Sequence, residues 1–173
     1  GTGHLLQTLT SANLVAAVDL SMTMLRYAGG KGFLGAQSSG KKLPFQGDCF
    51  DLVTAINVLQ SLKAGKVLID ELVRVTKPGG RIIVSTPNGQ NLTIGLLKIL
   101  EKEKYRHMGV YAAAELKGYF ASAGCTVESV LFLHYPLGRA RRVPGDRTAK
   151  FLHRRLATGL VVEARKSQVH PHA

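Results

Sequence analysis

The fold is decided by Gly1-Thr2-Gly3-His4 and by the stretch Leu14-Val-Ala-Ala-Val-Asp19-Leu20-Ser21 that follows it. A glycine pair at the start of a helix lets backbone N–H groups approach a ligand closely, because no Cβ stands in the way. Further on, an apolar strand ends in Asp19, and a carboxylate in that place can accept hydrogen bonds from the two hydroxyls of a ribose. A plain strand–turn–helix with a surface aspartate is the alternative, because the glycine fingerprint is only partial.

Strand and helix patterns alternate along the rest of the chain. Strands are predicted over residues 14–18, 33–34, 50–56, 81–85, 126–133 and 159–164, and helices over residues 4–9, 22–28, 64–75, 92–104, 112–123 and 151–156. This alternation predicts an α/β fold with a doubly wound, mostly parallel, Rossmann-like sheet. Since no long helix separates the last two long strands, we expect one antiparallel strand near an edge. Polar and basic loops are expected over residues 38–42 and 139–146.

Length and composition fit one globular domain. The 173 residues are 45% hydrophobic, and no apolar run approaches the roughly 20 residues that a membrane-spanning helix needs. We expect a domain over residues 1–166 and a loose tail over residues 167–173. Cys49 and Cys125 lack metal-type spacing, and no His, Cys, Asp and Glu cluster predicts a metal site. Two lone cysteines favour a reducing, cytoplasmic location.

The chain is strongly basic, with a formal net charge of +12. Much of this charge lies late in the sequence, in Arg139, Arg141, Arg142, Arg147, Lys150, Arg154 and Arg155. A basic protein attracts anionic partners, whether acidic substrates, acidic lipids or nucleic acid. Aromatic residues are sparse in this segment, so a platform for stacking bases is not evident. A solvated basic face is the favoured interpretation, and an acidic substrate or a membrane surface is the main alternative.

Several short motifs, taken together in order and spacing, resemble the class I S-adenosylmethionine-dependent methyltransferases, closest to the small-molecule enzymes of ubiquinone and menaquinone biosynthesis. The matching pieces are Gly1-Thr2-Gly3, Val18-Asp19-Leu20-Ser21, Leu43-Pro44-Phe45, Phe50-Asp51-Leu52-Val53, Asn57-Val58-Leu59, Glu71 to Arg81 with its Lys77-Pro78-Gly79-Gly80 turn, Glu115-Leu116 and Ala123-Gly124-Cys125. The family's fold is the Rossmann-like sheet predicted above. The resemblance implies S-adenosylmethionine as cofactor and a small-molecule or lipid-like methyl acceptor.

Carried over residue by residue, the resemblance implies a cofactor site. Its members are Gly1, Thr2, Gly3, Asp19, Leu20, Ser39, Gly40, Asn57 and Val58. Gly1 and Gly3 would pack under the methionine part, Asp19 would hold the ribose hydroxyls and Leu20 would lie on the adenine. Asn57 would lie beside the transferred methyl. Ser39 stands where the family usually has an aspartate that faces the adenine, so its hydrogen bond would lack charge assistance.

Catalysis itself places few demands on the residues. Methyl transfer is an in-line displacement, so the protein mainly aligns the nucleophile with the methyl group and excludes water. A base is needed only when the acceptor must lose a proton. The candidates are His107, Tyr105 and Tyr111, and we select His107.

Two other functions remain open at the level of the sequence. A nicotinamide-dependent oxidoreductase shares the glycines and the strand-end acid, but it leaves the Lys77-Pro78-Gly79-Gly80 turn unexplained. A non-catalytic relative that only binds its partners is the second alternative, supported by Ser39. A nucleic-acid acceptor is less favoured than a small molecule, because no recognition module is attached. The oligomeric state is not predicted.

The resemblance also implies a strand upstream of Gly1. In the family this strand lies in the middle of the sheet, between the strand that ends at Asp19 and the strand that ends at Ile56. Without it, two apolar strands would each present unpaired backbone groups along one edge. We therefore expect that upstream residues supply this strand and a further glycine.

Overall fold

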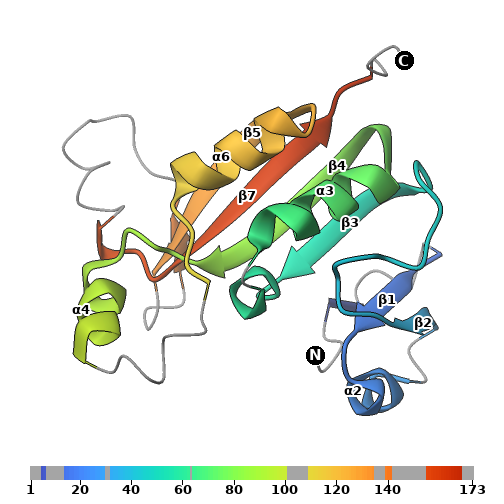
Figure 1. Cartoon of the computed structure of the whole chain (residues 1–173), viewed down its shortest axis with the longest axis horizontal. Coiled ribbons are helices and arrows are strands. Elements are labelled where there is room, and N and C mark those ends of the chain that lie inside the picture. Colours follow the sequence, from blue (N-terminus) through green and yellow to red (C-terminus); the bar gives the residue numbers. More distant parts are fainter. Residues whose placement is uncertain are drawn as a thin grey trace. The chain divides into compact units, whose positions relative to one another are not determined.

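A computed structural model describes residues 5–6, 14–29, 32–62, 64–100, 109–134, 139–141 and 155–168 (Figure 1). The chain forms two compact units, residues 1–46 and residues 47–173. Each unit is described by itself. The domain boundaries expected at residues 166 and 167 stay a prediction.

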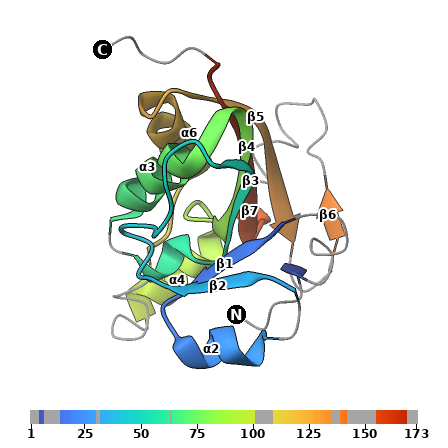
Figure 2. The ribbon, with the colours of Figure 1, turned by 90° about the vertical axis from the view of Figure 1, so that its right-hand side faces the viewer.

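The first unit contains a two-stranded parallel sheet and a short helix. β1 is Ala16–Asp19, α2 is Met22–Tyr27 and β2 is Leu34–Gln37. The predicted helix start at Ser21 is confirmed, because its Oγ accepts a hydrogen bond from the Met24 amide at 3.3 Å. In the parallel register Asp19 lies opposite Gln37. Both strands therefore end at the same edge of this sheet, as Figure 2 shows.

The second unit is built on a five-stranded sheet with the order β3-β4-β7-β5-β6. Its strands are β3 (Phe50–Ile56), β4 (Thr76–Pro87), β5 (Cys125–His134), β6 (Arg139–Arg141) and β7 (Gly159–Lys166). β3 and β4 are parallel, whereas β7 is antiparallel to both of its neighbours, β4 and β5. β7 is thus the expected antiparallel strand; it is the third of the five strands, with β5 and β6 beyond it, and β6 in turn is antiparallel to β5. Within the described residues, no strand pairs with β3 on the side away from β4.

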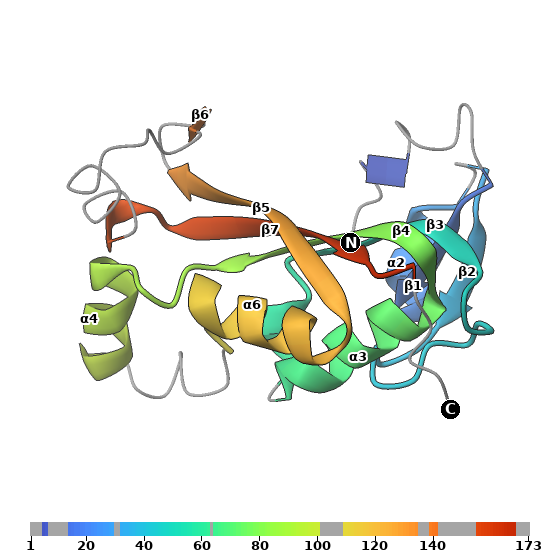
Figure 3. The same ribbon diagram turned by 90° about the horizontal axis from the view of Figure 1, so that it is seen from above.

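Helices cover one face of this sheet. α3 (Gly65–Val75) and α6 (Ala113–Ser122) lie side by side on that face (Figures 2 and 3), while η1 (Leu59–Ser61) follows β3 and α4 (Leu92–Leu100) follows β4. The covered face is apolar and fully buried, with Ile82, Val84, Leu160, Val162 and Ala164 from the strands and Leu116 and Phe120 from α6. The strands alternate, so the paired residues Ile83–Glu163 and Ser85–Val161 point to the other face.

Three elements differ most from the sequence prediction, while the bounds of the others shift by at most three residues; the helices predicted over residues 4–9 and 151–156 lie mostly outside the described residues. β4 begins at Thr76, directly after α3, instead of at Arg81. Phe50 pairs with Thr76 and Leu52 with Arg81, so the Pro78-Gly79-Gly80 turn forms a bulge inside the strand, with φ of +76° at Gly79. Residues 139–141 form strand β6 where we expected a basic loop, because they pair with the end of β5. α4 ends at Leu100, and the rest of its predicted range lies outside the described residues.

Candidate functional site

In the first unit, four of the predicted cofactor-binding residues lie at one edge of the sheet. Asp19 and Leu20 come at the end of β1, and Ser39 and Gly40 follow the end of β2. Because the two strands are parallel, their carboxyl ends meet at this edge, which is where open α/β sheets bind ligands. The structure therefore brings these four residues to one edge, as the sequence predicted.

Local hydrogen bonds hold this edge in shape. Asp19 Oδ1 accepts a hydrogen bond from the Ser21 amide at 2.8 Å, which fixes the orientation of the carboxylate. The Leu20 carbonyl accepts a hydrogen bond from Gln37 Nε2 at 2.9 Å, while the Leu20 side chain remains 69% exposed. An acid thus lies beside an uncovered apolar side chain, and these two chemistries suit a ribose and the face of a purine.

The loop after β2 forms a tight turn. Ser38 Oγ donates a hydrogen bond to the Lys42 carbonyl at 2.8 Å, which closes the loop. Gly40 is buried within it, and its φ of +75° is a left-handed conformation that favours glycine. Ser39 is exposed at the tip. Its hydroxyl can therefore reach a ligand, as the family resemblance requires.

In the second unit, Asn57 and Val58 follow the end of β3. Asn57 adopts a φ of +54°, which is uncommon for a residue other than glycine and typical of functional turns. Its backbone amide donates to Ser85, to the carbonyl oxygen at 3.1 Å and to Oγ at 3.1 Å. Val58 is 40% exposed. The ends of β3 and β4 are thus tied together.

A shallow pocket of about 230 Å³ opens beside Asn57 at this end of the sheet. It is lined by Ile56, Asn57, Ser85, Thr86, Leu133, Gly159, Leu160 and Val161. Register places Ile56, Ser85 and Val161 in one row across β3, β4 and β7, on the face that α3 and α6 leave open. The lining is mainly apolar and includes Ser85, whose Oγ accepts the hydrogen bond from the Asn57 amide. Such a site suits an apolar group that carries one hydrogen-bonding atom.

Sequence reasoning did not select Ser85, Leu133 or Gly159 for this pocket. Each lies near the end of a predicted strand, and this position was the only indication that the sequence offered of a role in a binding site. Position alone does not show which strands are neighbours. β7 enters the sheet between β4 and β5, and only that pairing brings Gly159 beside Leu133 and Thr86.

The catalytic candidates give different outcomes. His107, together with Tyr105, lies outside the described residues, as do Gly1, Thr2 and Gly3. Tyr111 is 6% exposed, and its hydroxyl donates to the Leu62 carbonyl at 3.0 Å. Burial raises the pKa of this phenol, so it stays protonated at neutral pH. Tyr111 therefore serves the packing of the unit and is a poor general base.

The donor set at the first edge fits S-adenosylmethionine better than a metal ion. An adenosyl group is bound by a carboxylate at its ribose, an apolar surface at its base and a small polar contact, and Asp19, Leu20 and Ser39 are side chains of these three kinds. Among the described residues, no group of three His, Cys, Asp or Glu side chains could hold a metal. No helix in the described ranges is long and apolar enough to cross a membrane.

Comparison with known proteins agrees with this geometry. Residues 1–84 match the family model described as a methyltransferase domain. The demethylmenaquinone methyltransferase of Clavibacter sepedonicus is 38% identical over 95 residues, which cover 50% of this chain and 38% of that protein. The ubiquinone/menaquinone biosynthesis C-methyltransferase UbiE of Desulfotalea psychrophila is 26% identical over 147 residues, 74% of this chain and 60% of that protein. The chain thus spans less than two thirds of the length of these curated relatives.

Solved structures share the fold. A possible histamine N-methyltransferase from Thermotoga maritima superposes with a TM-score of 0.69 at 18% identity, covering 88% of this chain and 73% of that chain. Enzymes of this class use S-adenosylmethionine as the methyl donor. Over residues 1–84 the chain is thus similar to the methyltransferase domain family, and over most of its length it shares the fold of solved S-adenosylmethionine-dependent methyltransferases.

Proposed function

We propose that the protein transfers a methyl group from S-adenosylmethionine to a small-molecule or lipid-like acceptor by in-line displacement. The observation that carries this proposal is the edge of the β1–β2 sheet, where a carboxylate, an uncovered leucine and a serine hydroxyl occur together at the strand ends. The family and the names of its relatives support the same reaction.

The first unit would hold the adenosyl part of the cofactor. Asp19 accepts hydrogen bonds from the ribose hydroxyls, Leu20 packs on the adenine face, and Ser39 makes a neutral hydrogen bond to the adenine edge. Gly40 allows the loop to turn without a Cβ in the way. The roles of Gly1, Thr2 and Gly3 under the methionine part, and of Asn57 and Val58 beside the methyl group, are proposed from the family resemblance.

The pocket beside Asn57 would hold the reacting end of the acceptor. Its volume of about 230 Å³ is below the roughly 300–1,000 Å³ of pockets for whole drug-sized ligands, so only part of a larger acceptor would enter. Its apolar lining favours a ring or chain, and the Ser85 hydroxyl offers one hydrogen bond. The relatives named demethylmenaquinone methyltransferases make a quinone-type acceptor the favoured chemical class.

When bound, the cofactor supplies an electrophilic methyl group on a sulfonium, with a neutral thioether as the leaving group. The chain's own residues bind the cofactor and the acceptor, orient them toward each other and exclude water from between them. This alignment supplies much of the rate enhancement of such displacements. A base is needed only for an acceptor that must lose a proton, and His107 is the proposed residue. Binding of S-adenosylhomocysteine, with no binding of NAD, tests the proposal against an oxidoreductase.

A non-catalytic binding protein is the second candidate, favoured by Ser39 in place of the family's aspartate. It predicts cofactor binding without turnover. Transfer of a radiolabelled methyl group to a reduced naphthoquinone separates the two. We also propose a cytoplasmic location, because neither Cys49 nor Cys125 forms a disulfide within the described residues.

A further inference from the structure

α4 presents an apolar face that no other element among the described residues covers. Leu92, Leu96, Ile99 and Leu100 are 55%, 56%, 67% and 70% exposed. Their spacing of four, three and one residues places them on one side of the helix. Four large apolar side chains on a nine-residue helix form a patch of the kind that marks a binding surface. We call these four residues the α4 face.

The α4 face is held by a rigid base. Asn91 Oδ1 accepts a hydrogen bond from the Ile94 amide at 2.9 Å and so caps the helix. The Asn91 side-chain amide donates to the carbonyls of Leu156 and Ala157 at 3.1 and 3.0 Å, and Asn88 donates to the same Ala157 carbonyl at 2.9 Å. Asn88 and Asn91 are 0% and 3% exposed. The buried amides therefore fix the start of α4, and its exposure is built into the fold.

The chain as a whole is basic, and the residues that follow α4 in the sequence alternate in charge: Glu101, Lys102, Glu103 and Lys104. Within its sequence, α4 carries Lys98 and no acidic residue. Arg155 is exposed next to Leu156, which is itself 53% exposed and whose carbonyl receives the Asn91 amide. The whole chain carries a formal net charge of +12. An anionic partner is thus attracted to the same molecule that exposes an apolar helix face.

We propose that the α4 face docks the protein on the surface of an anionic lipid bilayer. An interfacial helix buries its apolar side chains at the boundary of the headgroups, and basic residues add attraction to acidic lipids. A nucleic acid would satisfy the charge but would leave four aliphatic side chains in water. A bilayer satisfies both, and it would bring the protein to acceptors dissolved in lipid.

Sedimentation with lipid vesicles tests this proposal on the full chain. We expect binding to mixed vesicles of phosphatidylcholine and phosphatidylglycerol, weaker binding to phosphatidylcholine alone, and loss of the difference at high salt. The double variant Leu96→Ser/Ile99→Ser should partition at least about tenfold more weakly, because two half-exposed aliphatic side chains no longer enter the lipid. Its thermal unfolding should match the wild type.

Val67→Ser is the matched control. Val67 is also an aliphatic residue and is 42% exposed, but it lies on α3 and not on the α4 face. It should bind vesicles as the wild type does. Three results would overturn the proposal: no sedimentation of the wild type with the mixed vesicles, equal binding of the double variant, or a wild-type dimer in light scattering that the double variant dissolves. The last result would assign the α4 face to a second copy of the chain.

Discussion

Gly159 on β7 lies opposite Leu133 on β5, and a Cβ at Gly159 would lie 3.7 Å from the Leu133 Cβ. This distance is an ordinary van der Waals contact, so the backbone accepts a side chain here. The absence of one is what leaves room in the pocket beside Asn57. The proposed acceptor pocket therefore depends on a single glycine that the fold itself does not require.

Gly159→Val should narrow the pocket without unfolding the protein, because strands favour β-branched residues over glycine. We expect the KM for a reduced naphthoquinone acceptor to rise at least about fivefold. The affinity for S-adenosylhomocysteine should not change. Initial-rate kinetics and calorimetry measure these two quantities, with Gly159→Ala as the smaller step. An unchanged KM in both variants would show that the acceptor binds elsewhere.

Asp19→Ala should weaken the binding of S-adenosylhomocysteine by about ten- to a hundredfold, since a hydrogen bond to a charged group contributes about 1.5–3 kcal/mol. Asp19→Asn is the matched variant, because an amide oxygen can still accept the Ser21 amide that Asp19 Oδ1 accepts at 2.8 Å. It should keep the local structure yet bind the ribose more weakly than the wild type. Calorimetry measures both. If Asp19→Ala binds S-adenosylhomocysteine as tightly as the wild type does, Asp19 is a surface residue with no part in cofactor binding.

Ser39→Asp should tighten cofactor binding modestly. The exposed Ser39 occupies the position where the family usually has an aspartate, and a charged acceptor binds the adenine amino group more strongly than a hydroxyl does. Titration with S-adenosylhomocysteine compares the two proteins, and Ser39→Asn serves as the neutral control of similar size. Looser binding in Ser39→Asp would mean that the aligned position is wrong.

Two glycines on the second unit should respond to alanine with opposite signs. A Cβ at Gly80 would lie 2.7 Å from Thr76 Cγ2 and 2.9 Å from the Lys77 carbonyl oxygen, so Gly80→Ala should destabilise by about 1–3 kcal/mol. A Cβ at Gly118, within α6, meets nothing within 4 Å, so Gly118→Ala should stabilise by about 1 kcal/mol. Urea unfolding measures both. A stable Gly80→Ala variant would refute the bulge in β4.

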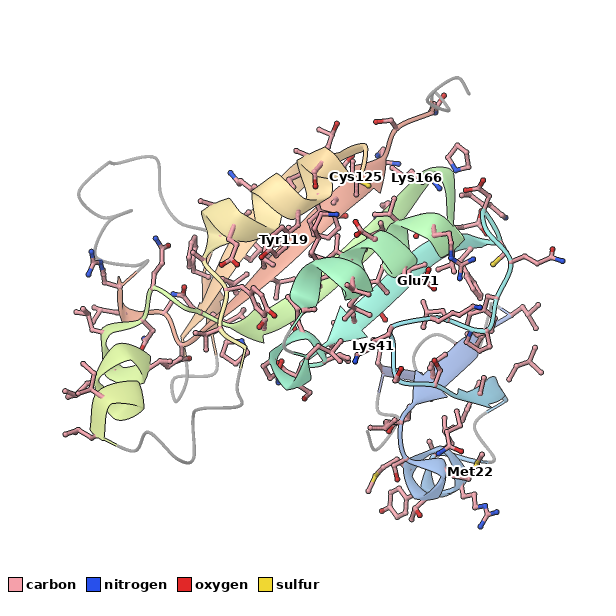
Figure 4. The ribbon with its side chains drawn as sticks, viewed as in Figure 1. Met22, Lys41, Glu71, Tyr119, Cys125 and Lys166 are labelled. Atoms are coloured by element: carbon pink, nitrogen blue, oxygen red, sulfur yellow. The ribbon has the colours of Figure 1, made fainter. Side chains whose placement is uncertain are left out.

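The two cysteines should differ in reactivity. Cys125 is 7% exposed, and its side chain lies near Lys166 where β5 begins and β7 ends (Figure 4). Burial raises the pKa of the Cys125 thiol, which leaves less of the reactive thiolate at a given pH. Cys49 is exposed. Iodoacetamide at mildly alkaline pH should therefore modify Cys49 in the native protein and Cys125 only after denaturation, as read by mass spectrometry. Early modification of Cys125 would place it outside the core.

Much of the fold follows from local sequence patterns. The largely apolar stretch Phe50–Ile56 matches β3 at both ends, and Gly124, with φ of +77°, ends α6 as its position predicts. The boundaries of β4 could not be predicted in this way. Pro78-Gly79-Gly80 is a turn signal, and only pairing with β3 absorbs it into a strand as a bulge.

The candidate site residues show the same difference between what local sequence patterns predict and what depends on strand pairing. Asp19, Leu20, Ser39 and Asn57 could be found because each follows a predicted strand, and strand ends are where such sheets bind ligands. The pocket residues Ser85, Leu133 and Gly159 become neighbours through long-range pairing of β4, β5 and β7. Pairing order is not encoded in local periodicity, so the pocket of the second unit could not be predicted from the sequence.

Parallel calorimetric titrations of the protein with S-adenosylhomocysteine and with NAD test the central claim most directly. The account predicts saturable binding of S-adenosylhomocysteine, weakened in Asp19→Ala, and no heat from NAD. Binding of NAD without binding of S-adenosylhomocysteine would contradict the account, because it would assign the carboxylate at the end of β1 to a nicotinamide cofactor.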